Sequence, residues 1–136
     1  MTDVQCPRIG VGAALLRGGK LLLIQRRRAP EAGCWSFPGG RLEWMEPVET
    51  AVAREVAEEV GVTLGAISLL CMTEWIAPER GEHWTAPVYL ATEFGGEPHL
   101  VEPECHAGLG WFALGALPQP LTEAVQKTAQ ILRQRG

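Results

Sequence analysis

Residues 54–61 read "REVAEEVG", and this short stretch decides how the rest of the sequence is interpreted. Pro47 lies upstream of it, and proline suits the first turn of a helix, where its missing N–H group is not needed. Gly61 closes the stretch, and glycine suits the left-handed residue just past a helix end. The sequence therefore predicts a helix over residues 47–60.

The glutamates of this helix lie where a solvated surface would not place them. Three valines form an apolar stripe along the predicted helix: Val48, Val52 and Val56. Glu59 falls about 40° from Glu55 on a wheel of about 100° per residue, which puts it within the stripe. Glu55, Glu58 and Glu59 also repel one another near the helix C-terminus, where the macrodipole disfavours negative charge. A bound divalent cation would remove these penalties, because clustered carboxylates are hard oxygen ligands.

Apolar runs on both sides of the helix predict β-strands. They are residues 9–16, 20–26, 66–77, 83–94 and 109–114. Gly18 and Gly19 separate the first two runs and predict a two-residue hairpin. Residues 28–46 are rich in glycine and proline, and they predict a long functional loop with a short extended piece at 35–37. Thr122 is expected to cap a closing helix.

The order of these elements predicts the fold class. The closing helix carries apolar side chains at helical spacing: Leu121, Val125, Ala129 and Leu132. Strand patterns interleave with two helices, and the chain length fits one compact domain over residues 1–136. We therefore expect an α/β domain with a mixed β-sheet and a helix on each face.

Composition and charge argue against several classes of function. The chain carries 12 Lys+Arg and 16 Asp+Glu, for a net charge of -4, and it has no long basic run that could follow a nucleic-acid backbone. Its apolar runs fall short of the ~20 residues that span a bilayer, and its N-terminus has no signal-peptide pattern. The cysteines lie far apart and form no C-x-x-C pair: Cys6, Cys34, Cys71 and Cys105. We expect a cytoplasmic protein with reduced thiols that binds neither a nucleic-acid polymer nor a membrane.

The spacing of residues 40–62 resembles a known signature. Gly40 is followed after five residues by Glu46, and after seven more by "REVAEEVGV". This segment is similar, position for position, to the signature box of the Nudix hydrolases, in which Glu46 would support the geometry between loop and helix. The flanking "GVGAALL", "GCWSFPGG" and "VEPECHAGLGWFAL" extend the resemblance to about residues 10–117 and look most like the MutT-like small nucleoside triphosphate diphosphatases.

The resemblance implies a fold, a reaction and a metal site. The fold is a Nudix-type α/β/α sandwich, and the reaction is Mg²⁺- or Mn²⁺-dependent hydrolysis of a nucleoside diphosphate linked to another group. By resemblance, Glu55 and Glu59 are the principal metal ligands, and Glu58 is a further ligand, directly or through water. The carbonyl of Gly39 completes the shell, and Arg54 orients the glutamates.

The resemblance leaves the general base open. A glutamate must take a proton from the attacking water. Glu59 or Glu58 is the favoured base, with Arg54 in a supporting catalytic role. Some relatives use a glutamate from a later loop, and Glu102 or Glu104 could act in that way here.

Candidates for substrate binding lie outside the helix. Arg26 and Arg28 precede the long loop and would lie on one side of a strand, so a guanidinium could bind the substrate phosphates bidentately. Gly40 permits a close approach of the backbone. Trp84 and Trp111 are candidates for an aromatic clamp on the nucleobase, although core or dimer packing explains most of the five tryptophans.

Three functions remain open at this point. The leading one is release of nucleoside monophosphate and pyrophosphate from a (d)NTP. An ADP-ribose or nucleotide-sugar diphosphatase is the alternative, suggested weakly by Pro78, which is also a simple turn residue. A non-catalytic nucleotide-binding module is the third, although such modules typically lose glutamates that are all present here. A homodimer is compatible with the tryptophan content, and no role is assigned to the histidines: His83, His99 and His106.

Overall fold

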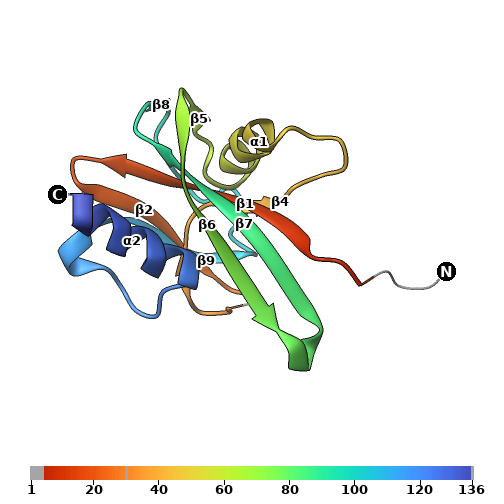
Figure 1. The fold of residues 1–136 in the computed structure, drawn as a ribbon. Helices are drawn as coiled ribbons and strands as arrows, with labels where there is room; N and C mark the ends of the chain where they lie inside the picture. The colour runs from red at the N-terminus through yellow and green to blue at the C-terminus, as the bar shows by residue number, and fades with distance from the viewer. Residues whose placement is uncertain (1–4, 30, 136) are drawn as a thin grey trace.

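The computed structural model describes residues 5–29 and 31–135, and Figure 1 shows its ribbon. Its elements, in chain order, are β1 (Arg8–Arg17), β2 (Lys20–Arg26), β3 (Trp35–Ser36), β4 (Gly39–Arg41), α1 (Val48–Val60), β5 (Thr63–Leu64), β6 (Ile67–Ala77), the 3-10 turn η1 (Pro78–Arg80), β7 (Glu82–Ala91), β8 (Phe94–Gly95), β9 (His106–Ala113), the 3-10 turn η2 (Leu114–Ala116) and α2 (Glu123–Arg135).

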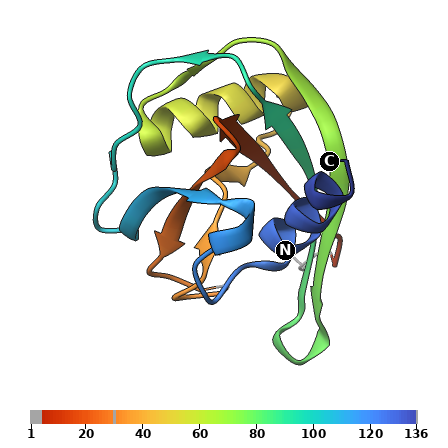
Figure 2. The same ribbon diagram turned by 90° about the vertical axis from the view of Figure 1, so that its left-hand side faces the viewer.

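A mixed β-sheet forms the centre of the molecule. Its strands lie in the order β3-β2-β1-β7-β6, with β4 added beside β1 and β9 beside β2. β1 and β7 run parallel, whereas the other strand pairs of the described residues are antiparallel. β5 and β8 form a separate two-stranded sheet. The hairpin of β6 and β7 extends beyond the rest of the molecule at its tip (Figures 1 and 2).

The two helices cover opposite sides of the sheet, as the turned view shows (Figure 2). Along β2, Leu22 and Ile24 belong to the apolar cluster under α1, and Leu21 and Leu23 belong to the cluster under α2. This alternation follows from the two-residue period of a strand that is buried on both faces. Each fully buried leucine contributes roughly 1.5–3 kcal/mol of transfer free energy, so both layers are stabilised by the same strand. The predicted α/β/α sandwich is confirmed.

Helix α1 is the predicted helix of the signature segment. It begins at Val48, one residue later than predicted, because Pro47 has an extended backbone and is the N-cap. It ends at Gly61, whose φ of 70° is left-handed and whose N–H group donates to the carbonyl of Ala57. Four of its side chains are buried against the sheet: Ala51, Val52, Val56 and Val60.

Most of the predicted strand pattern is confirmed. Gly18 and Gly19, with φ of 59° and 75°, form the two-residue turn between β1 and β2. The extended piece predicted at 35–37 is β3, which pairs with β2. Helix α2 follows Thr122, and the hydroxyl of Thr122 accepts a hydrogen bond from the N–H group of Val125 at 3.4 Å.

Three features differ from the prediction. β4 was not predicted, because its Gly-Gly-Arg sequence has no apolar alternation and it joins β1 through backbone pairing alone. β7 ends at Ala91 rather than at residue 94, since Phe94 turns away to pair with Leu64 in the small sheet. β9 begins at His106, earlier than predicted, because its register on β2 extends to Arg26.

Neither helix of the described residues is long and apolar enough to cross a membrane. The cysteines are free thiols: Cys6 is exposed, and Cys34, Cys71 and Cys105 are half-buried.

Candidate active site

Two glycines bring the start of β4 against the glutamates of α1. The N–H group of Gly39 donates to Oε1 of Glu59 at 2.7 Å. A Cβ atom at Gly40 would overlap the carboxylate of Glu55, so any larger residue there requires that carboxylate to move. The pairing of β4 with β1 fixes both glycines, since Gly39 lies opposite Gly12. An unpredicted strand therefore positions two of the predicted site residues.

Arg54 holds three carboxylates together. Its guanidinium donates to both oxygens of Glu46, at 2.7 Å from Nε and 2.9 Å from Nη2. Its Nη1 donates to Glu55 at 2.8 Å and to Glu58 at 3.2 Å. The hydrogen bonds from Arg54 lower the pKa of Glu46, and those same carboxylates raise the already high pKa of Arg54. Glu46 thus ties the loop to the helix, while Glu55 and Glu58 are held in position by a fixed cation.

Glu59 is the most strongly perturbed carboxylate of the helix. Its side chain is 14% exposed, and burial raises its pKa to about 8, with a further rise from the charges of Glu55 and Glu102. The hydrogen bond from Gly39 opposes this rise. Burial also raises the pKa of Glu55, against the lowering effect of Arg54. A buried carboxylate inside an acidic cluster is the arrangement that a cation would stabilise.

The raised pKa of Glu59 predicts a pH-dependent stability of the metal-free protein. A carboxyl group whose pKa is about 8 in the folded state and 4.5 in the unfolded state stabilises the fold fully below pH 4.5. This contribution is lost as the pH rises through 8, because the buried group must then ionise. We expect Glu59→Gln to gain stability relative to the wild type as the pH rises across this window. Urea unfolding in EDTA at about pH 5.5 and about pH 8.5 measures the difference. A difference that is equal at both pH values would contradict the assignment.

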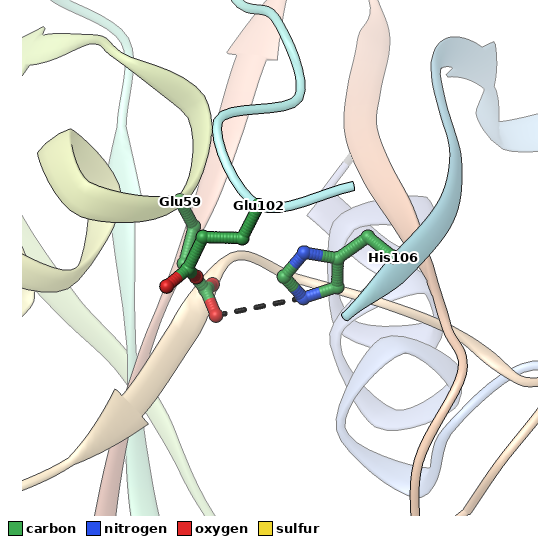
Figure 3. Close-up of side chains that lie close together, drawn as sticks. All are labelled: Glu59, Glu102 and His106. Carbon is green, nitrogen blue, oxygen red and sulfur yellow. Dashed lines mark ion pairs between the residues drawn. The ribbon is translucent and has the colours of Figure 1, made fainter. Parts of the chain in front are cut away.

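Glu102 and His106 complete a cluster with Glu59 (Figure 3). One donor atom of each residue lies within 4.8 Å of the others, and Nε2 of His106 lies 3.6 Å from Oε2 of Glu59. Of the two glutamates proposed as additional bases, only Glu102 is brought to this place, because Glu104 is exposed and lies outside the cluster.

His106 is the site residue that the sequence analysis missed. Its side chain is 6% exposed, and burial lowers its pKa, so the imidazole is neutral near pH 7. No sequence spacing could have identified it, because it reaches Glu59 only through the pairing of β9 with β2.

A cavity of about 310 Å³ reaches the site at Gly39 and Gly40, although the glutamates of the cluster and His106 do not line it. Arg26, Gly39 and Gly40 line it on the side of the glutamates. Trp75 and Trp84, which are paired across β6 and β7, line it farther along the sheet. The indole N–H groups of both tryptophans are buried and have no hydrogen-bond partner among the described residues. Trp75 was not predicted, because only its strand pairing brings it beside Trp84.

Two predicted substrate-binding residues lie elsewhere. Arg28 is exposed and does not line the cavity, because β2 ends at Arg26 and the alternation of side chains stops there. Trp111 packs against the cluster under α1, where it stacks on Phe94 at 6.0 Å. The guanidinium of Arg17 lies 4.3 Å from its ring. The positions of Arg28 and Trp111 therefore do not support the binding roles expected from the sequence.

The donor set fits a divalent cation. Carboxylate oxygens from two elements and one imidazole nitrogen converge within the described residues, which suits Mg²⁺, Mn²⁺ and related ions. The cavity meets this cluster at Gly39, so a molecule that lies in the cavity can extend to the carboxylates. Metal-assisted chemistry on an anionic ligand is what this arrangement can perform.

Comparison with known proteins identifies the family. Residues 7–134 match the NUDIX domain. A crystal structure of a MutT NUDIX hydrolase from Burkholderia pseudomallei is 56% identical, with a TM-score of 0.91, and the match covers 93% of this chain and 98% of that one. An 8-oxo-dGTP diphosphatase of Proteus vulgaris is 31% identical over 109 residues, which cover 79% of this chain and 96% of that protein.

A third relative points to a different substrate. An ADP-ribose pyrophosphatase of Methanocaldococcus jannaschii is 37% identical over 93 residues, which cover 67% of this chain. The chain spans only 54% of the length of that relative. Almost the whole chain matches one domain, and its fold is closely similar to that of a solved relative. This chain therefore belongs to the NUDIX domain family.

Proposed function

We propose that this protein hydrolyses a nucleoside triphosphate to nucleoside monophosphate and pyrophosphate, with Mg²⁺ or Mn²⁺ as cofactor. The observation that carries the proposal is the meeting of the carboxylates of α1 with the cavity at Gly39 and Gly40. The Proteus vulgaris relative, named for this type of reaction, supports the choice of substrate class.

Glu55 and Glu59 are the proposed principal ligands of the metal ion, with Glu58 and the carbonyl of Gly39 as further ligands. When bound, a divalent cation neutralises phosphate charge and makes a water molecule more acidic. Arg54 keeps Glu55 and Glu58 in place through hydrogen bonds of 2.8 and 3.2 Å. This fixed geometry matters because a displaced carboxylate no longer stabilises the charge that develops in the transition state.

Glu59 is the proposed general base, and Glu102 is the alternative. Burial raises the pKa of Glu59 to about 8 in the metal-free protein, so this carboxylate takes up a proton readily, and a bound cation would lower that pKa. Glu102 lies in the same cluster and can accept the proton if Glu59 remains fully engaged as a ligand. Glu58 is 50% exposed and paired with Arg54, which makes it the weaker candidate.

Arg26 and Trp84 are the proposed substrate contacts in the cavity. Arg26 lines its wall near the glutamates, where the phosphates must lie, and its charge acts on Glu59. Trp84 and Trp75 lie farther along the sheet, where a nucleobase can stack or accept a hydrogen bond from an indole N–H group. We therefore place the phosphates of the substrate beside Arg26 and its nucleobase beside the two tryptophans.

Cleavage of ADP-ribose is the second candidate function. The Methanocaldococcus jannaschii relative, named as an ADP-ribose pyrophosphatase, favours it. Its substrate has a pyrophosphate bond of the same chemistry, so the metal cluster serves both reactions equally. Only the substrate and products distinguish the two.

We expect turnover to require free Mg²⁺ or Mn²⁺ and to yield pyrophosphate in equal amount to nucleoside monophosphate. The test is a panel of unmodified and oxidised dNTPs, NTPs, ADP-ribose and nucleotide sugars, with product identification and a parallel series in excess EDTA. Full turnover in EDTA would reject the metal assignment. Orthophosphate without pyrophosphate, in the absence of inorganic pyrophosphatase, would exclude the diphosphatase reaction. Preferential cleavage of ADP-ribose would favour the second candidate.

The remaining expectations from the sequence stay proposals. The single domain over residues 1–136 stays a proposal, and so does the cytoplasmic location, with which free thiols agree. The homodimer stays a prediction, and the exposed apolar side chains of edge strand β6 are the surface that we would assign to it: Leu69, Met72 and Ile76.

A further inference from the structure

The imidazole of His106 is buried and makes no hydrogen bond to the residues that the structure describes. Its side chain is 6% exposed, and its Nδ1 atom has no hydrogen-bond partner among the described residues. Its Nε2 atom faces Oε2 of Glu59 at 3.6 Å, which is longer than a hydrogen bond. The buried ring therefore presents Nε2 to a carboxylate oxygen at a separation that leaves room for a partner between the two atoms.

The separation of His106 and Glu59 is compatible with two donors around one metal ion. Two donors that each lie about 2.1 Å from one ion are about 3 Å apart in adjacent positions and about 4.2 Å apart in opposite positions. The separation of 3.6 Å between His106 and Glu59 lies inside this range. The donor atom of Glu102 lies within 4.8 Å of both. Figure 3 shows the three side chains converging from α1, from the segment before β9 and from β9 itself.

The backbone holds this cluster in place. The segment that carries Glu102 passes the end of α1, where the N–H group of Val101 donates to the carbonyl of Glu59 at 3.2 Å. The N–H group of His106 donates to the carbonyl of Glu102 at 3.2 Å. Arg27 fixes the same segment from the other side, since its Nε donates to the carbonyl of Pro103 at 2.9 Å. These contacts pre-organise the donors without any contribution from a metal ion.

We propose that Nε2 of His106 is a direct ligand of a divalent cation that it shares with Glu59 and Glu102. The proposal rests on the proposed metal-dependent function and adds to it a nitrogen donor that the glutamates of α1 do not supply. Imidazole favours the later first-row ions, such as Co²⁺, over Mg²⁺. The site is therefore expected to prefer Co²⁺ over Mg²⁺ by a larger factor than a purely carboxylate site would.

Pulsed EPR of protein-bound Mn²⁺ tests the ligand directly. We expect coupling to a histidine ¹⁴N nucleus in the wild type, replaced by ¹⁵N coupling when only the histidines are ¹⁵N-labelled. This comparison needs no substitution, so it stands even if a variant folds poorly. His106→Gln should abolish the coupling, whereas His99→Gln should retain it. His99 is a matched control because it is exposed and lies on the same connection, near the end of α1.

Metal affinities provide a second readout. We expect His106→Gln to weaken Co²⁺ binding about tenfold or more in calorimetry, and Mg²⁺ binding less. Two results would overturn the proposal but leave the carboxylate site intact. One is bound Mn²⁺ that shows no histidine coupling in the wild type, and the other is histidine coupling that persists in His106→Gln. Equal losses for Co²⁺ and Mg²⁺ would also overturn it. A wild-type protein that binds none of these ions would reject the metal-dependent function itself, and the ligand role with it.

Discussion

Glu59→Gln is expected to lower kcat by at least about 10²-fold, the scale on which the loss of a proton acceptor or charge-stabilising group is measured. The substitution keeps the volume of the side chain and the Oε1 atom that accepts the hydrogen bond from Gly39. Above about pH 8, where Glu59 is ionised in the metal-free protein, it removes one negative charge from a buried position beside Glu55 and Glu102. The metal-free variant should therefore be as stable as the wild type or slightly more stable, because like-charge repulsion is relieved.

The measurement combines kcat with melting curves recorded in EDTA and in Mg²⁺. The metal-induced rise in Tm should shrink in the variant, because one ligand is weakened. Glu49→Gln is the matched control, because Glu49 is exposed and lies in the first turn of the same helix. This substitution should leave kcat and the metal-induced rise in Tm almost unchanged. Near-wild-type turnover with an undiminished metal-induced shift would refute the role of Glu59.

Gly40→Ala is expected to reduce kcat by a similar factor while leaving the fold largely stable. The added Cβ would overlap the carboxylate of Glu55, which is the flexible end of a side chain and can rotate away. The protein can thus accommodate the methyl group, but only by moving a proposed metal ligand out of its place beside Arg54. The activity loss should be accompanied by a smaller metal-induced rise in Tm.

Gly39→Ala separates this effect from simple destabilisation. A Cβ at Gly39 would meet the backbone carbonyl of Val11 and the Cα of Gly12, which cannot rotate away, so the pairing of β4 with β1 must shift. We expect a loss of stability of roughly 1–3 kcal/mol or more. Gly115→Ala is the control, since a Cβ there meets no heavy atom within 4 Å. If Gly40→Ala loses as much stability as Gly39→Ala and keeps its kcat, the proposed displacement of Glu55 is wrong.

The sequence determined the elements whose signals are local. Pro47 and Gly61 mark the ends of α1, because cap conformations depend on single residues. The consecutive apolar residues of β2 require an apolar layer on each face of the sheet, since neighbouring side chains of a strand point to opposite faces. The crowding of Glu55, Glu58 and Glu59 against the valine stripe indicated a cation site from helical geometry alone.

Only the tertiary structure decided which distant residues complete the site. No side-chain pattern predicts β4, because its two glycines pair with β1 through backbone groups. Trp75 stands beside Trp84 because of the register of β6 on β7, and Arg28 leaves the cavity because β2 ends before it. His106 reaches Glu59 because β9 pairs with β2. Contacts between residues far apart in the chain are set by strand register and packing, which no local pattern encodes.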